Sequence, residues 1–169
     1  MKKFLISSAG IVVILIFAVG YGHFYGLKNL SGYELNNFAT VETNQYTTNL
    51  DRGRHLSTIS GCNGCHGGNY QGMDFINEAP IGYVPAPNLT SAGPVANYTD
   101  NDWVKAIRHG IAKDGRVIVA MPSFHYSAYG DDDLAELIAY LKQIPAVENK
   151  FEKRNIQFPG SIIFGILVY

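Results

Sequence analysis

The stretch Cys62-Asn63-Gly64-Cys65-His66 decides how the rest of this chain is interpreted, because it has the spacing C-x-x-C-H. Two cysteines at this spacing place both sulfurs on one side of a short turn, where each can form a thioether to a vinyl group of a porphyrin. The histidine that follows directs its imidazole at the iron as the proximal ligand. The motif therefore predicts one covalent haem c, attached through Cys62 and Cys65 and ligated by His66.

Two other uses of a C-x-x-C pair compete with this interpretation. The chain contains 2 cysteines, so a structural zinc site, which needs four protein ligands, lacks its second cysteine pair. A thioredoxin-type redox pair opens a helix after a buried strand, and no hydrophobic strand precedes Cys62. Haem attachment is the favoured interpretation, and it leaves no cysteine for a disulfide.

Composition and charge narrow the class of protein. At 169 residues the chain has room for one domain of ordinary size with appended segments. Charged residues make up 16%, against about 25% in an average soluble protein. The formal net charge of −1 gives no indication of a nucleic-acid partner. A solvated helix face is favoured over a docking patch for the cations Lys105, Arg108, Lys113 and Arg116.

The N-terminal segment 1–27 predicts a single transmembrane helix. Lys2 and Lys3 precede an uncharged run from Phe4 to Leu27, and this pattern is typical of a membrane anchor whose N-terminus lies in the cytoplasm. A cleaved signal peptide is the alternative, since Ala18-Val19-Gly20 resembles a cleavage site, but the apolar run is long for one. Either alternative sends the following chain to the periplasmic, extracytoplasmic side of the cytoplasmic membrane.

Two further segments flank the central part of the chain. Residues 28–49 are polar and irregular, with no sustained helix or strand period, which predicts a polar linker. Aromatic residues within it argue against a purely flexible tether. Residues 148–169 form a tail that is first charged and then apolar. The apolar part is too short to span a bilayer, so the tail either folds back on the domain or contacts a membrane surface or a partner.

Residues 50–147 predict a small all-α domain. Its first helix, over 51–60, ends at Gly61 and delivers Cys62 into the haem-binding turn. The stretch 67–98 is rich in glycine and proline and predicts a long loop. A loop of that length normally counts against a compact domain, but a haem supplies an apolar core around which loops can wrap.

Two more helices are predicted after this loop. Thr99 and Asp102 form a variant of the capping box, and Trp103 begins the apolar face of the helix that follows. The run Asp131-Asp132-Asp133 suits the N-terminus of the last helix, because acidic residues there interact favourably with the helix dipole. The buried face of this last helix is predicted to comprise Leu134, Leu137, Ile138 and Leu141.

If His66 ligates the haem iron on one face, the ligand on the opposite face also has to be identified. Met121 is the predicted second axial ligand, because it lies in a helix-free stretch and a thioether is a soft ligand that suits haem iron. Ligation by His109 or His125 is the alternative, in which case Met121 fills a gap in the core. The remaining candidates are placed less well: Met1, Met73, His23 and His55.

The order of these motifs resembles that of a class I cytochrome c domain. The resemblance covers residues 50–147 and is strongest to single haem domains of membrane-bound alcohol and gluconate dehydrogenase cytochrome subunits and of related respiratory-complex cytochromes. The stretches that carry it are Gly53, Cys62–His66, Ala86-Pro87-Asn88-Leu89-Thr90, Asp102-Trp103, Met121-Pro122, Asp131-Asp132-Asp133-Leu134 and Ala139-Tyr140-Leu141. It implies a fold wrapped around one haem, His66 and Met121 as axial ligands, and a close crossing of Gly53 with an aromatic such as Tyr140. The dehydrogenase subunits usually carry three such domains, and this chain has one.

The sequence therefore predicts a membrane-anchored monohaem cytochrome c that carries single electrons and is not itself an enzyme. Its expected partners are redox proteins, with a quinol-oxidising complex as donor and an oxidase, reaction centre or soluble carrier as acceptor. The alternative is a fixed subunit of a larger membrane oxidoreductase complex, in which 28–49 and the tail are docking elements. A haem enzyme or gas sensor is a third hypothesis, and it requires an open sixth position on the iron.

Overall fold

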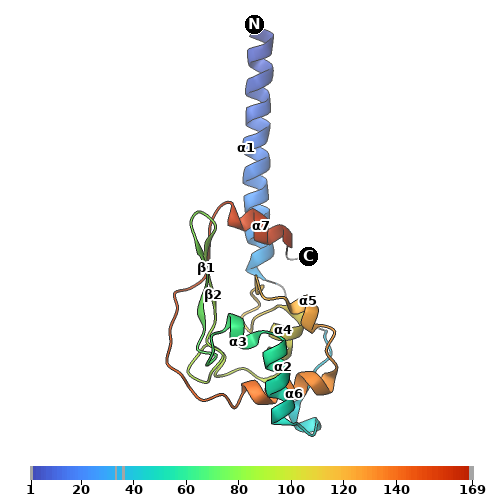
Figure 1. Cartoon of the computed structure of the whole chain (residues 1–169). Coiled ribbons are helices and arrows are strands. Elements are labelled where there is room, and N and C mark those ends of the chain that lie inside the picture. Colours follow the sequence, from blue (N-terminus) through green and yellow to red (C-terminus); the bar gives the residue numbers. More distant parts are fainter. Residues whose placement is uncertain (1, 33, 36, 168–169) are drawn as a thin grey trace.

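The computed structural model describes residues 2–32, 34, 35 and 37–167. A long N-terminal helix stands away from a domain of short helices and a small sheet, and the C-terminal helix lies across the base of the long one (Figure 1). Met1, one of the less favoured candidates for an iron ligand, lies outside the described residues. The arrangement places the predicted haem domain directly beside the end of the predicted anchor.

Helix α1, Lys2–Ser31, is continuous over 30 residues and therefore about 45 Å long. It continues past Leu27, where the sequence predicts its end. Within it, Ser8–Ser31 is apolar and long enough to cross a membrane. The large apolar side chains from Ile11 to Phe17 are all at least half exposed. Because water around such a surface is unfavourable, this part of α1 is suited to a lipid environment.

The helical core is built on the crossing of α2, Leu50–Ile59, with α6, Asp131–Leu141. Helix α2 has the predicted bounds to within one residue, and α6 begins with the predicted acidic run Asp131-Asp132-Asp133. A Cβ atom added to Gly53 would lie 2.2 Å from the Glu136 carbonyl oxygen and 2.8 Å from the Cβ of Tyr140. The expected close crossing of Gly53 and Tyr140 is thus confirmed, and only glycine fits there. The predicted buried face of α6 is also confirmed, with exposures of 0%, 1%, 0% and 2% for Leu134, Leu137, Ile138 and Leu141.

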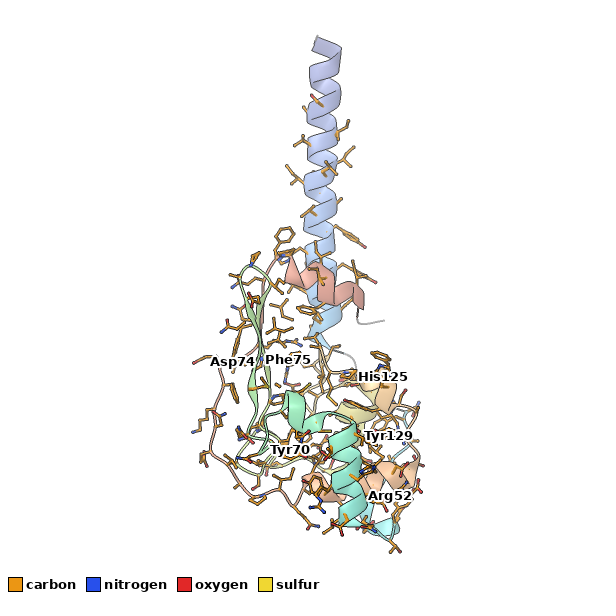
Figure 2. The ribbon with its side chains drawn as sticks, in the orientation of Figure 1. Arg52, Tyr70, Asp74, Phe75, His125 and Tyr129 are labelled. Carbon is orange, nitrogen blue, oxygen red and sulfur yellow. The ribbon has the colours of Figure 1, made fainter. Side chains whose placement is uncertain are left out.

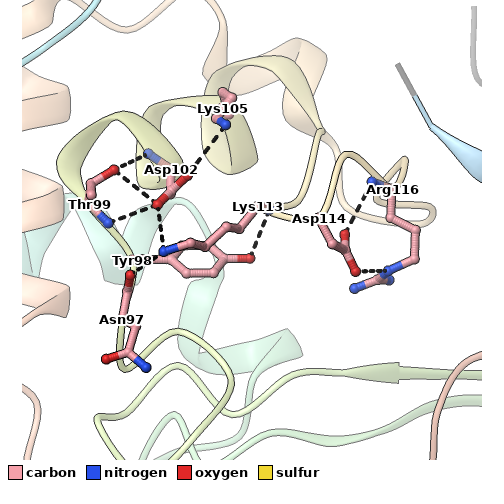
Figure 3. Close-up of polar contacts among 8 residues, drawn as sticks. All are labelled: Asn97, Tyr98, Thr99, Asp102, Lys105, Lys113, Asp114 and Arg116. Atoms are coloured by element: carbon pink, nitrogen blue, oxygen red, sulfur yellow. Dashed lines mark hydrogen bonds and ion pairs between the residues drawn. The ribbon is translucent and has the colours of Figure 1, made fainter. Parts of the chain in front are cut away.

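Helix α4, Asp100–His109, begins with the predicted capping box. Thr99 N donates to the Asp102 carboxylate at 3.0 Å, and Asp102 N donates to Thr99 Oγ1 at 3.2 Å (Figure 3). Burial raises the pKa of Asp102, but hydrogen bonds from Thr99 and the nearby Lys113 and Lys105 outweigh it and hold the pKa below its usual range. The carboxylate therefore stays ionised, and it fixes the start of α4 and the loop after it.

The four cations considered as a docking patch each pair with a carboxylate of the domain. Lys105 and Lys113 both contact Asp102, and the other two pairs are Arg108 with Asp131 and Arg116 with Asp114. Figure 3 shows the Asp102 and Asp114 pairs on either side of the turn that follows α4. These pairs give the cations an intramolecular role, so they do not form an unpaired basic surface.

The domain is not all-α, and in this respect the prediction is wrong. Within the stretch expected to be a loop, β1, Met73–Glu78, and β2, Gly82–Ala86, form an antiparallel hairpin. The short β3, Asn155–Ile156, adds to the free edge of β2. The sequence does not predict these strands. Strand β1 is exposed at every position except Ile76, so it buries no face that a sustained apolar alternation would mark. Pro85 inside β2 also argues against a strand.

The segment 28–49 differs from the expected polar linker. After α1 it runs along the domain, where Val41 is fully buried and Phe38 packs against the helical core. The amide and hydroxyl of Thr43 donate to the carboxylate of Asp100 at 2.8 and 2.7 Å. Few apolar residues make this attachment and their spacing has no period, which explains why the sequence pattern indicates a linker.

The described part of the tail, residues 148–167, folds back, as one of the two expected alternatives, and places α7, Gly160–Leu167, against α1 (Figure 1). The crossing is close, since a Cβ atom added to Gly26 would lie 2.1 Å from the Ser161 carbonyl oxygen. Asn29 Nδ2 donates to the Gly165 carbonyl oxygen at 3.2 Å. Small residues at a helix crossing let backbones approach and pack tightly. The tail is therefore held by the last turns of the predicted anchor.

Gly26→Leu is expected to release α7 from α1. A leucine side chain cannot be accommodated against the backbone of Ser161, and overpacking of this kind costs about 1–3 kcal/mol. Limited proteolysis of the detergent-purified protein should show faster cleavage in the tail. Gly20→Leu is the matched control, because a Cβ atom at Gly20 meets nothing within 4 Å. Equal cleavage rates in the two variants would contradict this account of the crossing.

Candidate functional site

A cavity of about 800 Å³ opens between the C-x-x-C-H turn, the β hairpin and the stretch 118–122. Cofactor sites typically have volumes of about 300–1,000 Å³. The cavity is lined by all four residues that the sequence singles out, which are Cys62, Cys65, His66 and Met121. The fold thus brings Met121 to the same cavity as a motif that lies far from it in the sequence.

The C-x-x-C-H turn is positioned by the end of α2. Gly61 has a φ of 73°, in the left-handed region that favours glycine, and this reverses the chain into the single-turn helix α3, Cys62–Cys65. Cys65 N donates to the Gly61 carbonyl oxygen at 3.2 Å, and His66 N donates to the Cys62 carbonyl oxygen at 2.8 Å. These bonds hold both cysteines on the wall of the cavity.

The environment of the cysteines does not favour the zinc alternative. Burial raises the pKa of Cys62 more than its hydrogen bond with Ser57 lowers it, so the thiol is neutral near pH 7. Among the described residues, no three His, Cys, Asp or Glu side chains are grouped closely enough to hold a metal ion. A neutral thiol beside an apolar cavity suits thioether formation instead.

His66 is fixed by the backbone of the mid loop. Its Nδ1 lies 2.8 Å from the Pro87 carbonyl oxygen. A carbonyl only accepts, so Nδ1 carries the hydrogen and donates it, which leaves Nε2 as the ring nitrogen with a lone pair. Burial lowers the pKa of His66 and outweighs the opposing effect of the Pro87 contact, so the ring is neutral. A neutral imidazole oriented through its other nitrogen is the usual form of a histidine metal ligand.

The loop that carries Pro87 is held by two buried polar side chains. Asn88 and Thr90 are 1% and 0% exposed, and Asn88 Oδ1 accepts from Thr90 N and Oγ1 at 2.9 and 2.7 Å. Asn88 Nδ2 donates to the Val147 carbonyl oxygen at 2.8 Å. The stretch Ala86–Thr90 thereby connects the histidine to the chain after α6. The sequence alone marks this stretch but gives no role for it.

Met121 reaches the cavity from the turn between α4 and α5, Ser123–Tyr126. Ala120 before it has a φ of 68°, and Ser123 N donates to the Met121 carbonyl oxygen at 2.9 Å. The side chain is half-buried and also packs against the helical core. Among the described residues, Met121 and His66 are the methionine and histidine side chains that line the cavity.

The alternative ligands lie elsewhere in the structure. His125 is exposed on α5 and packs against Phe124, at the side of the domain away from Asp74 and Phe75 of β1 (Figure 2). His109 is exposed at the end of α4. The exposed Met73, together with His23 and His55, also lies outside the cavity lining. Among the described residues, Met121 is therefore the remaining candidate for the second ligand of a group bound in the cavity.

No pattern in the sequence indicates that the tail takes part in this cavity. Residues 149–154 form part of its wall. They are held there because Asn88 Nδ2 also contacts the Asn149 carbonyl oxygen at 3.4 Å, while β3 pairs with β2. The segment has neither an apolar period nor a motif, so no local pattern could have revealed its place. The cavity wall is largely apolar, and it carries the two thiols of the motif, the neutral imidazole of His66 and the thioether of Met121. This set of groups fits a covalently bound haem.

Comparison with known proteins identifies a family. Residues 48–141 match the model of the family described as cytochrome C oxidase, cbb3-type, subunit III. The matched region begins just before α2 and ends with α6, so it includes the C-x-x-C-H turn, the hairpin and Met121. It excludes α1 and the tail.

Individual relatives are cytochrome subunits of membrane enzymes. The chain is 31% identical over 121 residues to the fructose dehydrogenase cytochrome subunit of Gluconobacter japonicus, covering 67% of this chain and 25% of the relative. It is 35% identical over 98 residues to the alcohol dehydrogenase (quinone) cytochrome c subunit of Gluconobacter oxydans, covering 54% and 20%. It is 28% identical over 122 residues to the cbb3-type cytochrome c oxidase subunit CcoP of Helicobacter pylori, covering 72% and 37%. The chain thus spans between a fifth and two fifths of the length of these relatives.

Proposed function

Because the chain belongs to the family of subunit III of cbb3-type cytochrome c oxidase, we propose that it is a membrane-anchored monohaem cytochrome c that transfers single electrons. The observation that carries this proposal is the single cavity lined by both cysteines, His66 and Met121. The haem c bound there supplies a centre that alternates between ferric and ferrous iron.

Each of the four residues has a separate role in this proposal. Cys62 and Cys65 hold the cofactor through thioethers, and His66 ligates the iron through Nε2. Pro87 keeps the His66 ring in one orientation and strengthens it as a ligand through the hydrogen bond at Nδ1. Met121 ligates through sulfur, which favours the ferrous state and raises the potential. If His66 and Met121 both held the iron, no position would remain on it for a substrate, and the chain would act as a carrier and not as an enzyme.

The proposed location is the cytoplasmic membrane, with α1 as a single-pass anchor. Its stretch Ser8–Ser31 is long and apolar enough to cross a bilayer. Lys2 and Lys3 at its start favour a cytoplasmic N-terminus, because basic residues are retained on that side. The haem domain follows the other end of α1 and therefore lies on the periplasmic side.

A fixed subunit of a membrane oxidoreductase complex is favoured over a carrier that swings on a tether. The supporting observation is that α1 continues to Ser31, and that the segment after it and the tail both pack on the folded domain. The relatives named above are cytochrome subunits of dehydrogenases and of an oxidase. The proposed redox partners are a quinol-oxidising or dehydrogenase subunit as donor and an oxidase, reaction centre or soluble carrier as acceptor.

The proposal is tested on the full chain extracted in mild detergent. A haem that stays with the denatured polypeptide, and a reduced form that does not bind carbon monoxide, are the expected results. Ready binding of carbon monoxide would overturn the six-coordinate assignment and point to a haem enzyme or gas sensor. Stoichiometric subunits that co-purify with the chain would identify a complex, whereas a monomer that reduces a soluble acceptor would identify a free carrier.

A further inference from the structure

The tail that follows the family-matched region forms part of the wall of the haem cavity. The match ends at residue 141, yet residues 149–154 line the cavity beside the hairpin. This wall is attached at both ends, by the contacts of Asn88 with Val147 and Asn149 and by the pairing of β3 with β2. A segment held in this way can contribute side chains to the site.

The charged side chains of the cavity wall come from two segments only. One is the turn with Asp114 and Arg116, and the other is the tail, with Lys150, Glu152, Lys153 and Arg154. With four cations and two carboxylates, the described wall has an excess of two positive charges. The lining residues that adjoin the cysteines in the chain, Ser60, Gly61 and His66, are uncharged, as is Tyr126, whose hydroxyl donates to the Ser60 carbonyl oxygen. The cavity therefore has an uncharged end at the cysteines and a basic part elsewhere.

Arg154 is the most constrained of these cations. Its Nη1 donates to the Val117 carbonyl oxygen at 2.6 Å, and its Nη2 donates to the Leu30 carbonyl oxygen at 3.1 Å. A guanidinium has five N–H groups and remains charged in proteins, so further donors are available. Burial lowers the pKa of Arg154, the charge of Arg116 lowers it further, and Asp114 opposes them. Arg154 is partly buried, and the N–H groups of its guanidinium that the two carbonyls do not use can donate to a further acceptor such as a carboxylate.

Arg116 is close enough to Arg154 for its charge to act on it, and it precedes Val117, whose carbonyl oxygen accepts from Arg154. It is paired with Asp114 at 2.9 Å (Figure 3), and both side chains of this pair are about half exposed. The turn that carries it lies against the end of α1, since Gly32 approaches the Gly115 carbonyl oxygen. Cys62 instead packs against the helical core of α2 and α6. The two arginines are thus on the α1 side of the cavity, apart from the cysteines.

We propose that Arg154 and Arg116 bind the propionate carboxylates of the haem, so that the tail of this chain completes the site. The inference rests on the proposed haem function. In a haem, the vinyl groups that react with the cysteines and the two propionates lie on opposite edges of the ring, which matches an uncharged cysteine end and a basic end. Arginine suits this role because its planar donors match a carboxylate. Through its bond to Leu30, Arg154 also connects the haem site to the end of α1.

The test compares Arg154→Gln with Arg54→Gln in the full, haem-loaded chain. Arg54 is a matched control, because it is exposed on α2, pairs with Asp51 and does not line the cavity. The measurement is the haem midpoint potential as a function of pH. At high pH, Arg154→Gln should have a lower potential than the control, because removal of a positive charge favours the ferric form. The pH at which the potential begins to fall should move upward, because a propionate without its cation holds its proton more tightly.

Arg154→Lys should restore most of the pH profile, because it keeps the charge. An Arg154→Gln protein with the potential and pH profile of the Arg54→Gln control would overturn the inference. If Arg154→Gln does not accumulate as folded protein, Arg116→Gln decides in the same assay: a shift in the same direction supports the inference, and an unchanged profile overturns it. An unmodified chain without covalent haem would instead overturn the proposed function, which keeps the two failures distinguishable.

Discussion

Met121→Ala is expected to open the sixth position of the iron and to lower the midpoint potential of the haem. The thioether stabilises ferrous iron, and axial ligands set haem potentials over about 0.8 V, so the decrease should be on the order of 0.1 V or more. The substitution also removes a half-buried side chain from the wall of the cavity, which leaves room for a small diatomic ligand. The reduced variant should therefore bind carbon monoxide, in contrast to the unmodified protein.

Absorption spectra with and without carbon monoxide, together with a redox titration, measure both effects. Met73→Ala is the matched control, because Met73 is 39% exposed on β1 and lies outside the cavity lining. The weak charge-transfer band that marks sulfur ligation of ferric haem should disappear in Met121→Ala and persist in the control. If both variants retain the spectrum and potential of the unmodified chain, Met121 is not the ligand, and a haem enzyme or sensor becomes the better hypothesis.

Gly53→Ala is expected to destabilise the domain by about 3 kcal/mol or more, at the upper end of overpacking effects. In an exposed helix the same change would be stabilising by up to about 1 kcal/mol. At Gly53 the change in the free energy of unfolding has the opposite sign. The new methyl group would lie 2.2 Å from the Glu136 carbonyl oxygen, which belongs to a helix backbone and cannot rotate away. Since domains are typically stable by about 5–15 kcal/mol, this is a large part of the total.

Thermal unfolding followed by far-UV circular dichroism measures the effect of Gly53→Ala. Gly68→Ala serves as the control, because a Cβ atom at Gly68 meets nothing within 4 Å. The control should unfold at nearly the temperature of the unmodified protein, and Gly53→Ala well below it. Equal unfolding temperatures would show that α2 and α6 can separate without loss, contrary to the geometry of the crossing.

The helices were predictable because their signals are local. The cap of α4 depends on Thr99 and Asp102, which are three residues apart, and the buried face of α6 repeats with the helical period. The hairpin was not predictable, since the exposed β1 carries no alternation and β2 contains Pro85. Its strand β2 also pairs with β3, which is far away in the sequence.

Some residues of the candidate site could likewise be predicted from the sequence, and others could not. The C-x-x-C-H turn is a contiguous motif, so its three side chains could be named from the sequence. Met121 could be named only because haem iron needs a second ligand and few residues can supply one. The roles proposed for Pro87 and Arg154 depend on a carbonyl contact and on the fold of the tail, respectively, and no pattern in the local sequence indicates either. Such contacts become visible only in three dimensions.

The continuity of α1 with the domain also determines the direction in which the haem faces. An α-helix turns by about 100° per residue. The position of Gly26 on α1, where α7 packs, therefore determines which side of the helix the domain faces. If α1 spans a bilayer as proposed, the edge of the proposed haem would lie at one height above the lipid and in one orientation about the helix axis. A redox partner that diffuses in the same membrane would then always approach this edge at the same height and from the same side.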